Sequence, residues 1–97
     1  MVKAWIVSVK VARDDNAPLS EQGMNQLADS LTKRGAEPVL RHSEGGAVLV
    51  SMTVDGRNEL EARSTAQNVL REAAGAVWSA LGLPPFTITL VEAKPKR

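Results

Sequence analysis

The chain repeats a short strand-like pattern, and both copies lead into the same kind of helix and the same kind of stop. The segment VSVKV at residues 7–11 returns in looser form as VSMTV at residues 50–54. Each copy is followed by a helical stretch that ends in a G-x-x-P sequence, at residues 35–38 and 82–85. The glycine pair at residues 45–46 separates the halves. Two strand–helix–strand halves in series predict a βαββαβ unit of the α+β class.

The length and composition fit one globular domain. The 97 residues are 43% hydrophobic and 24% charged, which is ordinary for a soluble protein. The chain contains no cysteine, so disulfides, thiolate metal sites and cysteine nucleophiles are excluded. No segment approaches the ~20 consecutive apolar residues that a membrane helix needs. We expect a cytoplasmic protein with a single domain over residues 1–92, followed by a short, flexible basic tail at residues 93–97 (AKPKR).

The first half predicts a strand, a helix and a second strand. Residues 4–12 alternate between two side-chain sets, as a half-buried strand does. Ser20 is a typical N-cap for a helix that ends at Gly35. Residues 37–43 predict a strand, and Pro38 places it at a sheet edge because proline has no N–H to donate. The apolar stripe of the helix follows helical spacing: Met24, Leu27, Ala28 and Leu31.

The second half repeats this order with a longer helix. Residues 48–54 predict a strand, and residues 55–56 (DG) predict a turn after it. Asn58 is positioned to cap a helix of about 23 residues, roughly 35 Å long, that ends at Gly82. Residues 86–91 alternate and predict the last strand.

We expect the first and third strands at the centre of a four-stranded antiparallel sheet, an arrangement that satisfies right-handed crossovers. The predicted order is therefore 4-1-3-2, a ferredoxin-like βαββαβ sandwich with two helices on one face. The strand residues that alternate toward the helices are Trp5, Val7, Val9, Val11, Val48, Val50, Met52 and Val54. The residues that alternate toward the uncovered face are Ile6, Ser8, Lys10, Leu49, Ser51, Thr53, Thr87, Thr89 and Val91.

The aromatic residues argue against stacking recognition of single-stranded nucleic acid. Such recognition needs aromatic side chains on the exposed face of the central strands. The chain has three aromatic residues, Trp5, Trp78 and Phe86, and the alternation assigns all of them to the inward side. The net charge of +1 also lacks the basic excess that is typical of nucleic-acid-binding domains.

The residues give little support to catalysis. His42 is the single histidine and has no partner of catalytic type, so it fits a surface strand position. Asp14 and Asp15 could act as an acid–base pair or hold a cation, but their polar loop is more typical of a turn. The glycine pair at residues 45–46 lies between two strands and fits a hairpin turn better than a phosphate loop. We therefore expect no enzymatic activity, no cofactor and no bound metal.

Three hypotheses of function remain. The first is an interaction module that binds a protein partner or itself, as a homodimer, through the uncovered sheet face. The second is weak binding of nucleic acid, with candidate phosphate contacts at Lys33, Arg34, Arg41, Lys94, Lys96 and Arg97. The third is regulation by a small ligand at residues 15–20, because the run DNAPL before a helix is similar to the start of ACT-type amino-acid-binding domains. In those domains a glycine follows the proline, whereas this chain has Leu19 there.

Overall fold

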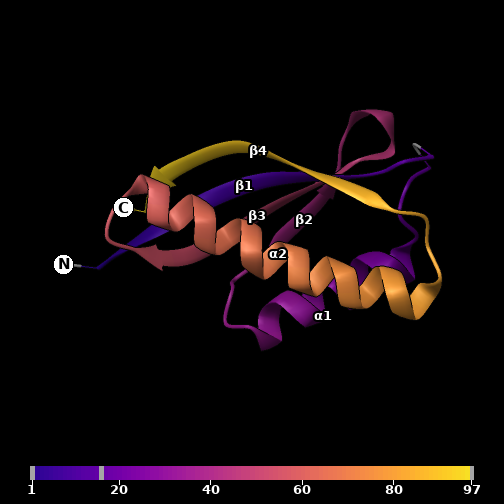
Figure 1. Ribbon diagram of the computed structural model, residues 1–97, viewed down its shortest axis with the longest axis horizontal. Helices are drawn as coiled ribbons and strands as arrows, with labels where there is room; N and C mark the ends of the chain where they lie inside the picture. The colour runs from indigo at the N-terminus through magenta and orange to yellow at the C-terminus, as the bar shows by residue number, and fades with distance from the viewer. Residues whose placement is uncertain (1, 16, 97) are drawn as a thin grey trace.

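A computed structural model describes residues 2–15 and 17–96 of the chain (Figure 1). The elements follow one another as β1 (Lys3–Arg13), α1 (Glu21–Lys33), β2 (Val39–His42), β3 (Val48–Gly56), α2 (Glu59–Leu81) and β4 (Phe86–Pro95). A short 3₁₀ turn, η1 (Glu44–Gly46), connects β2 to β3. Both helices lie on the same side of one sheet, and α2 runs along the length of the molecule.

The four strands form one antiparallel sheet in the order β2-β3-β1-β4. This confirms the α+β class, with a four-stranded antiparallel sheet and two helices, that the sequence predicts. The observed order is the predicted order 4-1-3-2 read from the opposite edge of the sheet. In the central pair, Ser8 lies opposite Ser51 and Val9 lies opposite Val50, so the two similar segments face each other.

The helices begin and end at the predicted residues. The Ser20 side chain accepts a hydrogen bond from the N–H of Gly23, and the Asn58 side chain accepts one from the N–H of Glu61. These bonds satisfy N–H groups that have no partner within the helix. Gly35 follows the end of α1 with φ of 83°, and Gly82 ends α2 with φ of 63°. Both values lie in the left-handed region that glycine adopts without strain.

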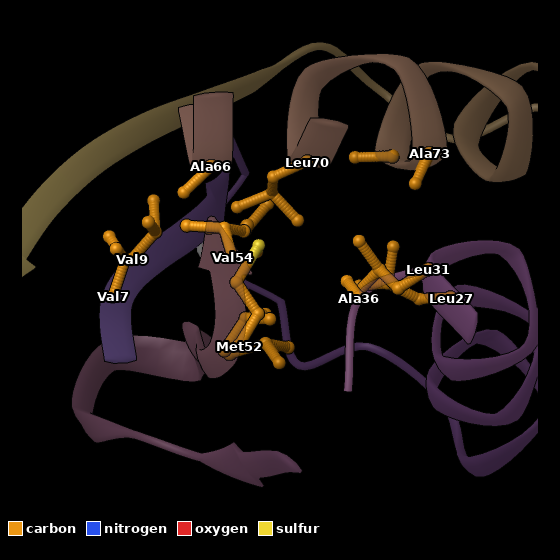
Figure 2. Close-up of a cluster of buried hydrophobic side chains, with 14 of the residues drawn as sticks. Val7, Val9, Leu27, Leu31, Ala36, Met52, Val54, Ala66, Leu70 and Ala73 are labelled. Carbon is orange, nitrogen blue, oxygen red and sulfur yellow. The ribbon is translucent and has the colours of Figure 1, made fainter. Parts of the chain in front are cut away.

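The core lies between the sheet and the helices (Figure 2). All eight strand residues that the sequence assigns to the inside are buried. Leu27 and Leu31 of α1 pack toward them, and Met52 and Leu70 lie between the layers. The stripe of α2 that faces the sheet consists mainly of small side chains, which let the long helix approach the strands closely. The buried residues of α2 are Ala62, Ala66, Leu70, Ala73, Ala74, Val77 and Trp78.

The structure corrects two of the predicted boundaries. The predicted turn at residues 55–56 is wrong, because β3 continues through Gly56, which pairs with Lys3. The Trp5 indole N–H donates to the Gly56 carbonyl over 3.0 Å, and the backbone of Ala62 packs closely against Gly56. Tertiary contacts therefore hold this segment extended. The second strand is also shorter than its predicted span of residues 37–43, since β2 begins at Val39.

The last strand is longer and less regular than predicted. β4 extends to Pro95, and beyond it the N–H of Lys96 donates to the Ala4 carbonyl over 2.9 Å. Leu90 lies opposite Val9, but Glu92 lies opposite Ser8, so Val91 is the extra residue of a β-bulge. The strand therefore does not end at the predicted domain boundary of residue 92. Arg97, the last residue of the predicted tail, lies outside the described residues.

Candidate interaction face

The side of the sheet opposite the helices forms what we call the open face. Within the described chain neither helix covers it (Figure 1). The alternation and register of the strands place the predicted face residues there. They come from alternate positions of three strands. Their neighbours on β1 and β3 are buried in the core, whereas Phe86, Ile88 and Leu90 of β4 are partly buried against it. The open-face residues predicted from the sequence are Ile6, Ser8, Lys10, Leu49, Ser51, Thr53, Thr87, Thr89 and Val91.

The centre of the open face is partly apolar, and its serine and threonine side chains are small. The Oγ atoms of Ser8 and Ser51 lie 3.1 Å apart and share a hydrogen bond between the two central strands. Ile6 lies opposite Thr53, and Lys10 lies opposite Leu49, on either side of the serine pair. All of these side chains are half-buried by their neighbours. Small hydroxylated residues beside aliphatic ones leave a surface on which another flat surface can pack.

Register adds four residues to the open face that the sequence analysis did not assign to it. Val39 and Arg41 of β2 lie opposite Ser51 and Leu49, and the alternation of β2 could have placed them there. Glu92 and Lys94 of β4 lie opposite Ser8 and Ile6. Without the bulge at Val91, the alternation would turn Glu92 toward the core. The bulge reverses this, so that Ala93 packs on the core instead.

Exposed apolar side chains gather toward the open face. Among the described residues, the large hydrophobic side chains that remain exposed are Val2 (58%), Val39 (58%), Leu60 (75%) and Val91 (54%). Val39 and Val91 lie on the two edge strands of the sheet, and Val2 precedes β1 in the same alternation as Ile6. Leu60 lies apart, in the first turn of α2. The helical layer therefore exposes one of these side chains and the open face exposes the others.

Charges of both signs surround the apolar centre. Lys10, Arg41 and Lys94 are accompanied by Glu92 and by Asp55, which lies opposite Ala4. At one end, the Nζ of Lys96 lies 3.6 Å from an Oε atom of Glu37, so the chain after β4 and the chain before β2 form an ion pair. A face with interspersed charges suits contact with a protein surface of mixed charge better than contact with a polyanion.

The structure does not bring the candidate phosphate contacts together. Arg34 lies on the helical side, where it donates to the Oγ of Ser30 over 2.8 Å and lies 3.8 Å from an Oε atom of Glu72 in α2. Lys33 is beside it at the end of α1. Arg41 lies on β2 at one edge of the sheet, and Lys94 and Lys96 lie in and just after β4 at the other edge. Arg97 lies outside the described residues.

The candidate catalytic residues also lie apart. His42 is exposed at the end of β2. Asp15 has structural partners: its carboxylate accepts from the N–H of Ala17 over 3.2 Å and from an Nη of Arg13 over 2.7 Å. The bond from Ala17, followed by the bond and charge of Arg13, lowers the pKa of Asp15. These contacts are those of a turn that holds the loop, as the alternative interpretation of the sequence predicts.

In the described residues, no three histidine, aspartate or glutamate side chains are grouped as a metal site would require. No helix in the described part of the chain combines the length and the apolar character that a membrane span requires. Comparisons with protein-family models, with curated proteins and with solved structures give no match for this chain.

Proposed function

We propose that this chain is a ferredoxin-like, non-enzymatic interaction module of the cytoplasm that associates with a second copy of itself through the open face. The βαββαβ order of elements and the strand order β2-β3-β1-β4 support the ferredoxin-like assignment. The observation that carries the functional proposal is the distribution of exposed apolar side chains. Val2, Val39 and Val91 surround the half-buried Ile6 and Leu49 on one face.

The size of the open face supports a reversible association. Four strands spaced ~4.8 Å apart are about 19 Å wide, and the nine residues of β3 span about 30 Å. Two such faces would together bury roughly 1,200 Å², which is at the lower end of specific interfaces. A dimer of this kind would form at high concentration and separate on dilution.

The scattered cations give the nucleic-acid hypothesis less support than the self-association hypothesis. Affinity for nucleic acid grows with the number of phosphates that are neutralised together. Arg34 has an ion pair within the helical layer, and Lys96 has one with Glu37. A salt titration of DNA binding separates the two hypotheses. If no binding is detected at ~50 mM salt, the nucleic-acid hypothesis is wrong.

Light scattering during gel filtration tests the proposal with a matched pair of variants. Leu49→Glu places a carboxylate in the open face between Lys10 and Arg41, which lie opposite Leu49 on the neighbouring strands and can balance the new charge. Leu60→Glu makes the same chemical change at an exposed position of α2. The circular dichroism spectra of both variants should match that of the parent chain.

We expect the mass of the parent chain to rise toward twice that of one chain as concentration increases. Leu60→Glu should follow it, whereas Leu49→Glu should remain monomeric. A parent chain that is monomeric at the highest concentration contradicts the proposal. So does a mass that responds equally to the two substitutions.

A further inference from the structure

The edge of β3 is uncovered along the last part of the strand. The pairing of β2 with β3 runs from His42 opposite Val48 to Val39 opposite Ser51. β3 continues to Gly56, and this continuation pairs with β1 alone. The sheet therefore has a gap, which we call the notch, beside residues 52–56 of β3. One more extended segment would fit there beside β3.

Two hydrogen bonds show which backbone groups point into this notch. In an antiparallel strand, the N–H and C=O of one residue point to the same side, and the side alternates along the chain. The N–H of Ser43 donates to the Ala47 carbonyl over 2.7 Å, so Ala47 points toward β2. Ser51, Thr53 and Asp55 are in the same phase and point to the same side.

The other edge of β1 gives the same result independently. Lys96 donates to the Ala4 carbonyl on the β4 side, so the next residue, Trp5, points its backbone groups toward β3. Trp5 lies opposite Val54, which therefore points toward β1, and the residues on either side of Val54 point away from it. Within the described chain, no backbone hydrogen bond reaches Thr53 or Asp55 from the notch side.

The preceding segment of the chain cannot fill the notch. Residues 34–37 leave the end of α1 within the helical layer, where the N–H of Ala36 donates to the Leu31 carbonyl over 3.2 Å. Ala36 is buried there. Pro38 follows, and it has no N–H with which to continue the ladder. The segment therefore joins the sheet only at Val39.

A cavity of about 360 Å³ occupies this position. Its walls are the edge of β3 at residues 53–55, the segment at residues 34–37, and Thr65 and Val69 of α2. The walls combine backbone donors and acceptors with a small apolar surface from α2. Of the charged residues at its margin, Glu37 pairs with Lys96 and Arg34 pairs with Glu72. The exposed carboxylate of Asp55 has no ion pair within the described residues, so it favours a cationic side chain beside it.

We propose that the notch binds an extended peptide of about three residues from a protein partner, with a basic side chain beside Asp55. Thr53 and Asp55 are about 7 Å apart along the strand, which is the reach of three residues in an added strand. The peptide would bond through its main chain to Thr53 and Asp55 and place a small apolar side chain against Val69. This is recognition by β-strand addition. The side chain of Thr53 belongs to the open face, but the peptide would pair with the backbone groups of Thr53 and Asp55 at the strand edge. Its binding therefore does not require self-association.

A nitrogen-15 NMR titration with a blocked pentapeptide, acetyl-Val-Lys-Val-Lys-Val-amide, tests this site. We expect the amide signals of Thr53 and Asp55 to shift progressively, and Asp55→Asn to weaken binding by ~2- to 5-fold, as the loss of one exposed ion pair does. An otherwise identical peptide with N-methyl groups at alternate residues should bind much more weakly, because it lacks the N–H groups that pair with β3. Leu49→Glu should bind the probe as the parent chain does.

Four results would overturn the proposal. The first is the absence of shifts at ~10 mM probe. The second is equal binding of the N-methylated and unmethylated probes, which would show that binding does not use main-chain hydrogen bonds to β3. The third is a set of shifts centred on Ser8, Leu49 and Ser51 of the open face or on β4. The fourth is a change of the Thr53 and Asp55 signals with concentration alone in Leu49→Glu, which should not self-associate through the open face. The notch would then pair with a second copy, and the partner peptide would be wrong.

Discussion

Gly56 tests whether the end of β3 is held by close packing against α2. A Cβ atom at this position would lie 2.9 Å from the backbone nitrogen of Ala62 and 3.2 Å from its Cβ. Backbone atoms of a helix cannot rotate away as a side chain can, so Gly56→Ala must displace β3 or α2. Overpacking of this kind costs ~1–3 kcal/mol, and the lower flexibility of alanine in the unfolded chain recovers ~0.4–1 kcal/mol. We expect a net loss of about 1–2 kcal/mol in the free energy of unfolding.

The same substitution at Gly75 is the matched control. Gly75 lies inside α2, and an added Cβ would meet no atom within 4 Å. Alanine is better than glycine in a helix by ~1 kcal/mol, so Gly75→Ala should stabilise the protein.

Urea denaturation followed by tryptophan fluorescence measures the change in stability for both variants. The signal reports on the region of Gly56, because the Trp5 indole donates to the Gly56 carbonyl. Because one substitution destabilises the protein and the other stabilises it, their thermal midpoints should shift in opposite directions. In a domain of this length the shift is ~4–8 °C for each kcal/mol. If Gly56→Ala is neutral or stabilising while Gly75→Ala behaves as expected, the packing argument at Gly56 is wrong.

The remaining predictions concern the layers, a helix cap and the acidic loop. Val9→Asp should prevent folding because it buries an unpaired charge, whereas Ser51→Asp should fold; circular dichroism would contradict the layer assignment if the outcomes were reversed. Asn58→Ala should lower the free energy of unfolding by ~1 kcal/mol, and an unchanged urea midpoint would rule out the cap. The pKa of Asp15 is lower folded than unfolded, so its stabilising effect is present above its ordinary pKa and is lost as the pH falls through the folded value. Asp15→Asn should therefore weaken the pH dependence of stability in this acidic range, and identical profiles would contradict it.

Local patterns were sufficient to predict most of the fold. In β1 and β3 the alternation of side chains corresponds residue by residue to burial, because one face of each strand meets the helices and the other does not. The helix termini were equally clear, since Ser20, Asn58 and Gly82 act through bonds or dihedral angles within a few residues. The predicted open-face residues followed from the same alternation.

Features that depend on distant contacts could not be predicted in this way. The sequence at residues 55–56 is a common turn sequence, but the contacts of Gly56 with Trp5 and Ala62 keep it extended. The bulge at Val91 shifts the alternation of β4 by one residue, and no local feature of the strand sequence predicts it. Glu92 was therefore missing from the predicted face. The notch beside β3 was also hidden, since it depends on where β2 begins.

Methyl NMR spectra recorded at increasing protein concentration test self-association through the open face most directly. We predict that the methyl signals of Ile6, Leu49 and Val39 shift together and saturate along one binding curve. The methyl signals of Leu60, which is exposed on the helical side, should remain unchanged. Spectra that do not change with concentration, or shifts that centre on Leu60 instead of Ile6 and Leu49, would contradict the proposed interface.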